Sequence, residues 1–527
     1  YTLEMSGSNV FALSSNVVGA TSTELVWKSN ESQILYGSDT EADDRFGSTV
    51  SVDGNYAVIG ADNEDAGGSN AGAAYIFHKS GGTWAQQAKL VAGNADAGDK
   101  FGRSVSISGD YVVVSSPFED TTATDSGSVY IFKRSGTTWS QQQQIQASDA
   151  ADSDFLGAGI GQGGGGIAID NDYFIIGAVN NDDGDTNTGS AYIFKRNTGS
   201  ETWSEQSKLV ASDPTAGDQF GTSVSISGDY AVAGAPNQDT TASNAGSVYI
   251  FKRSGTSWTQ QQKIQASDAG EDDTFGGGAG QGVSLSGDYL AVGARQEDTG
   301  GSQAGSVYIF KKDDGAETWT QQAKLQASDV SAAAQFGMAV SLSGNTLAVG
   351  ANAEDTAAAD AGAAYIFERS GTTWTEVKKI TASDAAASDY FGESISTDGT
   401  TTFVGAWGED TNDSGAGAAY VFEKGPAIVP TLNFDGYNKL SINNFNTSAV
   451  NFTDAAITGT AYYPGSMTWS DNKLTSSATG DWVTGRARTT TKFNKSTIAG
   501  IQFRVSRKAD YWNMQILTPD DTETWMT

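Results

Sequence analysis

The chain has 527 residues and carries 63 acidic side chains against 31 basic ones, so its formal net charge is −32. This charge excludes a protein that holds nucleic acid by neutralising phosphates, and it argues against a polybasic membrane anchor. The lack of cysteine and the single histidine, His78, exclude disulfides, thiol nucleophiles, Cys/His zinc sites and histidine networks.

Residues 1–22 are expected to form an N-terminal extension, and a repeat occupies residues 23–424. The dipeptide Phe-Gly opens six copies, and Leu156-Gly157 opens one more, with starts 55 to 64 residues apart. The phenylalanines are Phe46, Phe101, Phe220, Phe275, Phe336 and Phe391.

Each copy predicts four strands. In the copy that begins at Phe220, residues 223–226 alternate between polar and apolar, and a short turn leads to a second strand at 230–234. Residues 248–251 are continuously apolar, which is typical of a strand buried on both faces, and a polar fourth strand follows Trp258. Four-stranded units repeated at this spacing predict the blades of a β-propeller.

The seventh copy stops after its third strand. Residues 26–39 resemble the missing fourth strand and its exit loop. We therefore expect the N-terminal strand to complete the seventh blade, which would close the ring and remove two open sheet edges. The predicted fold class is all-β, a seven-bladed propeller closed by an N-terminal strand and followed by a small β-sandwich-like domain.

The Phe-Gly start and the Gly234-Ala235-Pro236 end of the second strand resemble the FG-GAP repeat. That repeat builds the seven-bladed propeller of integrin α subunits and of many secreted bacterial and viral proteins. The resemblance spans residues 23–424 and implies an extracellular location. Integrin-type copies resemble D-x-D-x-D-G-x-x-D between strands one and two, but residues 108–111 read Ser-Gly-Asp-Tyr, so calcium would need a different loop here.

Acidic residues recur at three positions of the repeat. Seven residues before the Phe position stand Asp39, Asn94, Asp149, Asp213, Asp268, Asp329 and Asp384. Two residues before it stand Asp44, Asp99, Asp154, Asp218, Asp273, Ala334 and Asp389. Five residues after the glycine that ends strand two, whose place Ser115 takes in the second copy, stand Asp65, Asp120, Asp182, Asp239, Asp298, Asp355 and Asp410.

Antiparallel strand order places all three sets on one side of the ring. We call the side with the blade-to-blade loops and the loops between strands two and three the loop face, and the other side the turn face. The turn face is predicted to be basic, because its turns carry His78, Lys79, Lys133, Arg134, Lys195, Arg196, Lys252, Arg253, Lys311, Lys312, Arg369 and Lys424.

Two interpretations of the aspartates stay open. Each side chain could cap a turn by accepting hydrogen bonds from backbone amides. Alternatively, carboxylates of the two loops could meet and bind Ca²⁺, which prefers six to eight oxygen ligands. The candidate ligands are Asp44, Asp65, Asp99, Asp120, Asp154, Asp182, Asp218, Asp239, Asp273, Asp298, Asp389 and Asp410.

One position varies while the rest of the repeat stays constant. Two residues after the strand-two glycine stand Asp62, Pro117, Val179, Pro236, Arg295, Asn352 and Trp407, which we expect near the axis on the loop face. A constant scaffold under a changing ring is typical of a binding surface. Phe118, Arg295 and Trp407 are the predicted partner contacts, the alternative being that they fill space.

Two glycine-rich stretches, residues 157–166 and 276–282, lack the lysine of a phosphate-binding loop and are interpreted as insertions that allow close backbone approach. The aspartates recur in most blades, which suits structure better than one catalytic pair. We therefore expect no enzyme activity.

A linker is predicted at residues 425–430 and a C-terminal β domain at 431–527, which could be cut short at its end. Residues 427–527 carry nine basic and eight acidic side chains, so an excess of 33 negative charges belongs to residues 1–426. Strand-like runs lie at 439–442, 461–463, 482–484, 501–505 and 512–517. The tryptophans of this domain, which either stack on sugars or form its core, are Trp469, Trp482, Trp512 and Trp525.

These patterns favour a non-catalytic extracellular recognition or adhesion module that binds a protein or glycan on a cell or particle surface through the loop face. The alternative is a self-assembling structural subunit of a virion fibre, appendage or surface layer, and a glycan-active enzyme is the third hypothesis. Neither nucleic-acid binding nor membrane insertion is expected.

Overall fold

The computed structural model describes residues 25–159, 166–277, 281–313 and 315–426, together with six strands between residues 449 and 506. The chain divides into two compact units, residues 25–425 on the one hand and residues 1–24 with 426–527 on the other. The described residues form strands and turns without any helix, and hence without a helix that could cross a membrane.

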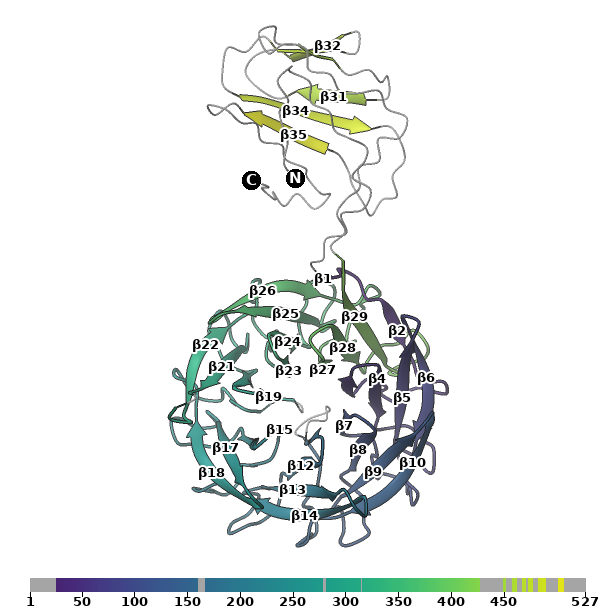
Figure 1. Cartoon of the computed structure of the whole chain (residues 1–527), viewed down its shortest axis with the longest axis vertical. Helices are drawn as coiled ribbons and strands as arrows, with labels where there is room; N and C mark the ends of the chain where they lie inside the picture. The colour runs from purple at the N-terminus through teal and green to yellow at the C-terminus, as the bar shows by residue number, and fades with distance from the viewer. Residues whose placement is uncertain are drawn as a thin grey trace. The chain divides into compact units, whose positions relative to one another are not determined.

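Residues 25–425 form a ring of seven antiparallel sheets, the blades of a β-propeller (Figure 1). Blades one to three contain β3 (Thr49–Asp53), β4 (Tyr56–Ala61), β5 (Ala73–Ser80), β6 (Thr83–Leu90), β7 (Val105–Ser108), β8 (Tyr111–Ser116), β9 (Ser128–Ser135), β10 (Thr138–Ile145), β11 (Ile167–Asp170), β12 (Tyr173–Ala178), β13 (Ser190–Asn197) and β14 (Thr202–Leu209). Blades four to six contain β15 (Val224–Ser227), β16 (Tyr230–Ala235), β17 (Ser247–Ser254), β18 (Ser257–Ile264), β19 (Val283–Ser286), β20 (Tyr289–Ala294), β21 (Ser306–Lys312), β22 (Trp319–Leu325), β23 (Val340–Ser343), β24 (Thr346–Ala351), β25 (Ala363–Ser370) and β26 (Thr373–Ile380). The predicted all-β, seven-bladed architecture is confirmed.

The seventh blade contains β27 (Ser394–Thr397), β28 (Thr401–Ala406) and β29 (Ala418–Pro426), and the N-terminal β1 (Leu25–Trp27) and β2 (Gln33–Leu35) both pair with β29. In the register of β2, Ile34 lies opposite Tyr420 and Leu35 opposite Ala419. Trp27 of β1 donates from its indole N–H to Glu368 Oε1 of blade six at 2.9 Å.

The first strand of every blade lines the axis and contacts the first strand of the next blade, and β27 contacts β3. The alternating sequence of these strands explains the contacts. The apolar residues of each first strand are buried. Ser51 and Ser106, from the polar half of the pattern, accept hydrogen bonds at 3.2 Å from the backbone amides of Ile107 and Ile169, respectively, each in the next blade. The polar half of the alternating pattern thus joins blades instead of meeting solvent.

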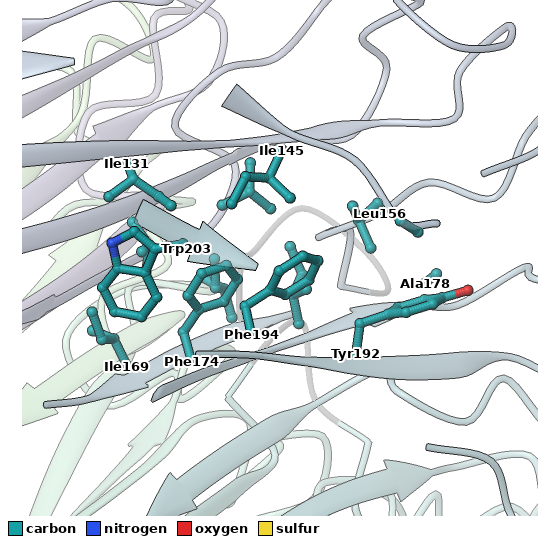
Figure 2. Packing of buried hydrophobic residues seen from close by; sticks show 14 of the residues in the cluster. Ile131, Ile145, Leu156, Ile169, Phe174, Ala178, Tyr192, Phe194 and Trp203 are labelled. Atoms are coloured by element: carbon teal, nitrogen blue, oxygen red, sulfur yellow. The ribbon is translucent and has the colours of Figure 1, made fainter. Parts of the chain in front are cut away.

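The hydrophobic core lies between neighbouring blades. Figure 2 shows one such cluster, in which Ile131 and Ile145 of blade two face Phe174 and Trp203 of blade three. Third strands are apolar over consecutive residues because both of their faces are covered, as the sequence predicts.

The Phe-Gly dipeptide fixes each blade to the preceding one. Phe46 is fully buried and meets Tyr75 edge-on with ring centroids 5.4 Å apart. Gly47 has a φ of +91°, and a Cβ there would lie 2.2 Å from the carbonyl oxygen of Ala418, so only glycine fits. Blade three opens with Leu156 instead, and there Phe174 stacks on Phe194 at 4.7 Å.

The second unit contains β30 (Ala449–Asn451), β31 (Ile457–Ala461), β32 (Met467–Ser470), β33 (Lys473–Ser476), β34 (Trp482–Thr489) and β35 (Ile501–Ser506). They form two three-stranded antiparallel sheets, β30-β33-β32 and β31-β34-β35. The runs expected at 439–442 and 512–517, Trp512, Trp525, the extension at 1–22 and most of the linker lie outside the described residues. A β-sandwich therefore stays a prediction.

Candidate functional site on the loop face

The loops that carry the aspartates run side by side. The amide of Phe101 in a blade-to-blade loop donates to the carbonyl of Ala71 in the preceding blade's loop between strands two and three, at 2.8 Å. Parallel bridges such as Gly246 to Phe275 repeat this contact around the ring. The loop face is thus a continuous surface of interlocked backbone, onto which the repeated side chains are fixed.

The set five residues after the strand-two glycine caps turns in all seven blades. Asp65 Oδ1 accepts from the Asn70 amide at 2.7 Å, and Asn70 adopts a φ of 54°. The equivalent carboxylates are Asp120, Asp182, Asp239, Asp298, Asp355 and Asp410, each accepting from the amide five residues later. The capping interpretation is confirmed for this set.

The set two residues before the Phe position is buried and also caps. Asp44 Oδ2 accepts from the Glu41 amide at 2.7 Å, and Asp389 Oδ2 from the Ala386 amide at 2.6 Å. Burial, with additional repulsion from neighbouring carboxylates, raises the pKa of Asp44 and of Asp389 to about 6. The same cause raises the pKa of the other members, Asp99, Asp154, Asp218 and Asp273.

The set seven residues before the Phe position belongs to a polar network. Asp268 accepts from the Tyr308 hydroxyl at 2.8 Å and from Lys324 Nζ at 2.7 Å. Burial acts to raise the pKa of Asp268, but the hydrogen bonds from Lys324 and Tyr308 outweigh it and hold that pKa below its usual value. This carboxylate is therefore kept ionised by partners within its own blade.

A fourth position of the repeat, which the sequence predictions did not include, is also polar in every blade. Four residues after the strand-two glycine stand Glu64, Glu119, Asn181, Gln238, Glu297, Glu354 and Glu409, all of them buried. Glu64 and Glu297 accept from the lysines of their own blades, at 2.6 and 2.9 Å. Aligning the repeats would have revealed this position, because every copy has an acid or an amide there, but a search for aspartate alone missed it.

Calcium binding by the twelve predicted aspartates stays a prediction. Within the described residues, no three acidic or histidine side chains converge closely enough to hold a metal ion. The set that contains Asp44 and the set that contains Asp65 do come near each other, since repulsion from Asp65 and from its neighbour Glu64 raises the pKa of Asp44. The contacts seen are capping bonds to backbone amides, and they do not by themselves fit the six to eight oxygens that Ca²⁺ requires.

The three predicted partner contacts lie in two places. Phe118 in blade two is half-buried, packs on Phe155 with centroids 5.2 Å apart, and lines a pocket of about 370 Å³. Its other lining residues are mostly acidic or small: Asn94, Asp96, Ala97, Gly98, Asp99, Glu119, Asp120, Thr121 and Asp125. Phe118 is thus an apolar spot in an acidic pocket.

Arg295 and Trp407 belong to the varying ring instead. Arg295 Nη1 lies 3.7 Å from Met338 Sδ, while its Nε has no partner. Trp407 stacks on Tyr390 with centroids 4.8 Å apart, and the guanidinium of Arg45 lies 5.0 Å from its ring. Both are held by neighbouring blades.

Several charged residues at and beside the varying ring are buried. Arg103 pairs with the fully buried Asp62 at 2.9 Å. Burial raises the pKa of Glu393 to about 7, although Arg295 and a hydrogen bond from Asn352 lower it. Arg103 and Arg295 therefore each lie near a carboxylate, and only Arg295 was predicted from the sequence to lie in this region.

The prediction of a basic turn face is wrong. Three of its arginines pair with an aspartate of the turn between strands one and two: Arg134 with Asp110, Arg196 with Asp172 and Arg253 with Asp229. Arg134 also lies over the ring of Tyr56, 4.1 Å from its centroid. The prediction rested on the turns after strand three, whereas the acids that neutralise their cations lie in the turns between strands one and two.

Gln281, in the second glycine-rich stretch, reaches across the axis. Gln281 Oε1 accepts from the Ile395 amide of blade seven at 3.0 Å, and its Nε2 donates to the Val50 carbonyl of blade one at 3.3 Å. This side chain crosses the space between the first strands. Residues 160–165 and 278–280 lie outside the described residues.

Comparison with known proteins gave a family and a set of distant folds. The model of the FG-GAP repeat matches residues 29–77, 84–132, 139–194, 203–251, 258–310, 319–367 and 374–422. No curated protein sequence matched the chain.

Solved structures that resemble the chain are distant. A putative 6-phosphogluconolactonase from Bacteroides fragilis is 16% identical, with a TM-score of 0.42 over 65% of this chain and 86% of that one. The periplasmic gluconolactonase of Pseudomonas aeruginosa is 14% identical, with a TM-score of 0.43 over 64% and 86%. Sqt1 from Saccharomyces cerevisiae is 11% identical, with a TM-score of 0.40 over 76% and 100%. At these values no activity carries over to this chain.

Proposed function

Because the chain belongs to the FG-GAP repeat family, we propose that it is a non-catalytic extracellular recognition or adhesion module that binds a surface partner through its loop face. The observation that carries this proposal is that constant and varying positions lie together on that face. Capping and network residues recur from blade to blade, while the ring near the axis and the pocket at Phe118 differ. A constant scaffold with local variation is how folds of this kind acquire a binding surface.

Support for a non-catalytic role comes from the carboxylates themselves. An acid-base pair needs two carboxyl groups in distinct environments that face one substrate. Here the members of each set have the same partners in nearly every blade. The set of Asp239 accepts from the backbone amide five residues later, the set of Asp218 from the amide three residues earlier, and the set of Asp213 from a tyrosine and a lysine. Such repetition supports a structural role for these carboxylates.

The pocket of blade two offers the sharpest test. We expect Phe118→Ala to reduce binding to the partner at least tenfold, because a central aromatic anchor usually carries a large share of the binding energy. Val377→Ala is the matched control, since Val377 is an exposed apolar side chain on the outer strand β26. Binding of the labelled propeller to arrays of surface glycans and proteins would be measured, with the unfolding midpoint as a check on folding.

An unchanged affinity of the Phe118→Ala protein, combined with normal folding, would contradict a loop-face site at this pocket. Strong self-association that neither substitution affects would favour the second candidate function, a structural subunit of a fibre, appendage or surface layer. Light scattering of the purified chain distinguishes the two, because a recognition module is expected to remain monomeric without its partner.

A further inference from the structure

Five blades hold a lysine ammonium group in the same place. The lysine lies on the fourth strand, directly opposite the tyrosine of the third strand that bonds to the aspartate seven residues before the Phe position. The ammonium groups of Lys89, Lys208, Lys263, Lys324 and Lys379 lie 2.6 to 2.8 Å from those aspartates. The buried acid or amide four residues after the strand-two glycine often supplies a second ligand.

Blade two shows what accompanies the loss of this lysine. Gln144 stands opposite Tyr130 in the lysine position, and the aspartate is replaced as well, by Asn94. Asn94 Nδ2 then donates to Glu119 Oε1 at 3.0 Å. The cation and one anion have disappeared together, and an amide satisfies the remaining carboxylate.

Blade seven has lost the cation alone. Ile34 of β2 stands opposite Tyr420 in the lysine position, but both acids remain, as Asp384 and Glu409. Asp384 accepts from the Tyr420 hydroxyl at 2.9 Å, and Glu409 Oε1 accepts from the Thr411 amide at 2.8 Å. Glu409 is only 3% exposed and its Oε2 has no partner.

The uncompensated charge of Asp384 and Glu409 affects the pKa of a neighbouring residue. Burial and the repulsion of Glu409 and Asp384 raise the pKa of Tyr36 to about 12. In blade six Glu354 also has one oxygen without a partner, but its other oxygen lies 3.2 Å from Lys379. Among the described residues, neither Asp384 nor Glu409 forms an ion pair.

We propose that Asp384 and Glu409 bind a primary ammonium group supplied from outside the propeller, the side chain of a lysine on a partner protein. The proposal rests on the recognition function and names the chemistry that the loop face would recognise. A compact ammonium with three N–H donors suits two carboxylates, and the other blades show that geometry with their own lysines. Ca²⁺ would need more oxygens than these residues bring together.

The test uses small amines and unfolding midpoints, so it does not depend on finding the partner. For the wild-type chain we expect n-butylammonium chloride to raise the midpoint by about one to three degrees more than the same concentration of tetramethylammonium chloride, which has no N–H donor. Ile34→Lys fills the site from within, so it should raise the midpoint in buffer and abolish the difference between the two salts. Glu409→Gln should abolish the difference as well.

Lys379→Ile is the matched control, because it creates the same vacancy in blade six, beside Asp329 and Glu354. It should lower the midpoint in buffer and enlarge the difference between the two salts. Equal midpoints in both salts for the wild type, or an undiminished difference in both Ile34→Lys and Glu409→Gln, would overturn the ammonium site. Either result would leave the recognition function standing, since that function is judged by binding at the Phe118 pocket.

Discussion

At the scale of single residues, aspartate has three different structural roles on the loop face. In blade seven, Asp410 caps an exposed turn, Asp389 caps a buried one, and Asp384 accepts from a tyrosine hydroxyl. The three environments differ in burial and in the charge of the partner. Two residues before the Phe position, burial dominates and raises the pKa of Asp389. Seven residues before the Phe position, burial is outweighed in five blades by a lysine, which lowers the pKa of aspartates such as Asp213.

Substituting Asp389 by asparagine should raise the unfolding midpoint at pH 7.5 but not at pH 4. The folded-state pKa of Asp389 is about 6, above its value of about 3.9 in an unfolded chain. The folded state therefore binds the proton more tightly, and the stability that this provides is full below pH 4 and lost as the pH rises towards 6. Asparagine keeps an acceptor for the Ala386 amide without the charge, so we expect a gain of about 1 kcal/mol at pH 7.5, measured by thermal unfolding.

Asp213→Asn is the control with the opposite sign. Burial acts to raise the pKa of Asp213, but hydrogen bonds from Lys263 and Tyr249 lower it overall. Its contribution is present above the unfolded pKa and is lost as the pH falls. The asparagine variant should thus be less stable than the wild type at pH 7.5, with the difference shrinking towards pH 3. A pH-independent effect of both substitutions would show that charge plays no part in either.

The sequence predicted where the aspartates lie but not which neighbours they have. Position in an antiparallel blade follows from strand order, and strand order follows from the alternating pattern around residues such as Ser225 and Ile226. The lysine of the fourth strand and the glutamate near the end of strand two meet only through register and loop geometry. The pairing of Arg134 with Asp110 was missed for the same reason, because it joins two different turns.

At the scale of elements, the blade is a unit that is completed by its neighbours. Gly47 and its equivalents allow the backbone of one blade to touch the next, and the serines of the first strands form hydrogen bonds across the same boundary. Figure 1 shows β1 and β2 beside β29, so the seventh blade contains chain segments from both ends of the propeller. The stability of the ring should therefore depend on β1 as much as on any internal outer strand.

Trp27→Ala and Trp139→Ala form a matched pair that tests this dependence. Each indole is buried, with 7% and 8% of the residue exposed, and each donates its N–H to a neighbouring blade's side chain at 2.9 Å. Removing a large buried aromatic costs about 3–5 kcal/mol, so both variants should lose comparable stability in chemical unfolding. If Trp27→Ala had no effect while Trp139→Ala destabilised the protein, β1 would not be an integral strand of blade seven.

At the scale of the whole molecule, the acidity is unevenly compensated. Residues 1–426 have 33 more acidic than basic side chains, and the turn face uses its cations in local pairs such as Lys312 with Asp288. Much of the uncompensated charge thus faces outward from the loop face, where burial and the repulsion of nearby carboxylates raise the pKa of Asp44 and of Asp125. Such a surface attracts cationic partners and repels a second copy of itself.

Raising the salt concentration should therefore stabilise the propeller. Between 0.05 and 0.5 M NaCl the screening length falls from above 10 Å to about 4 Å, which weakens repulsion across the loop face. Exposed ion pairs on the turn face lose strength too, but each contributes only about 0–1 kcal/mol, so we expect a net rise of a few degrees in the unfolding midpoint. A lower midpoint at high salt would mean that local pairs outweigh the repulsion.

CaCl₂ at matched ionic strength tests the calcium prediction in the same experiment. Screening depends on ionic strength alone, whereas a bound divalent ion adds a further rise in the unfolding midpoint that EDTA reverses.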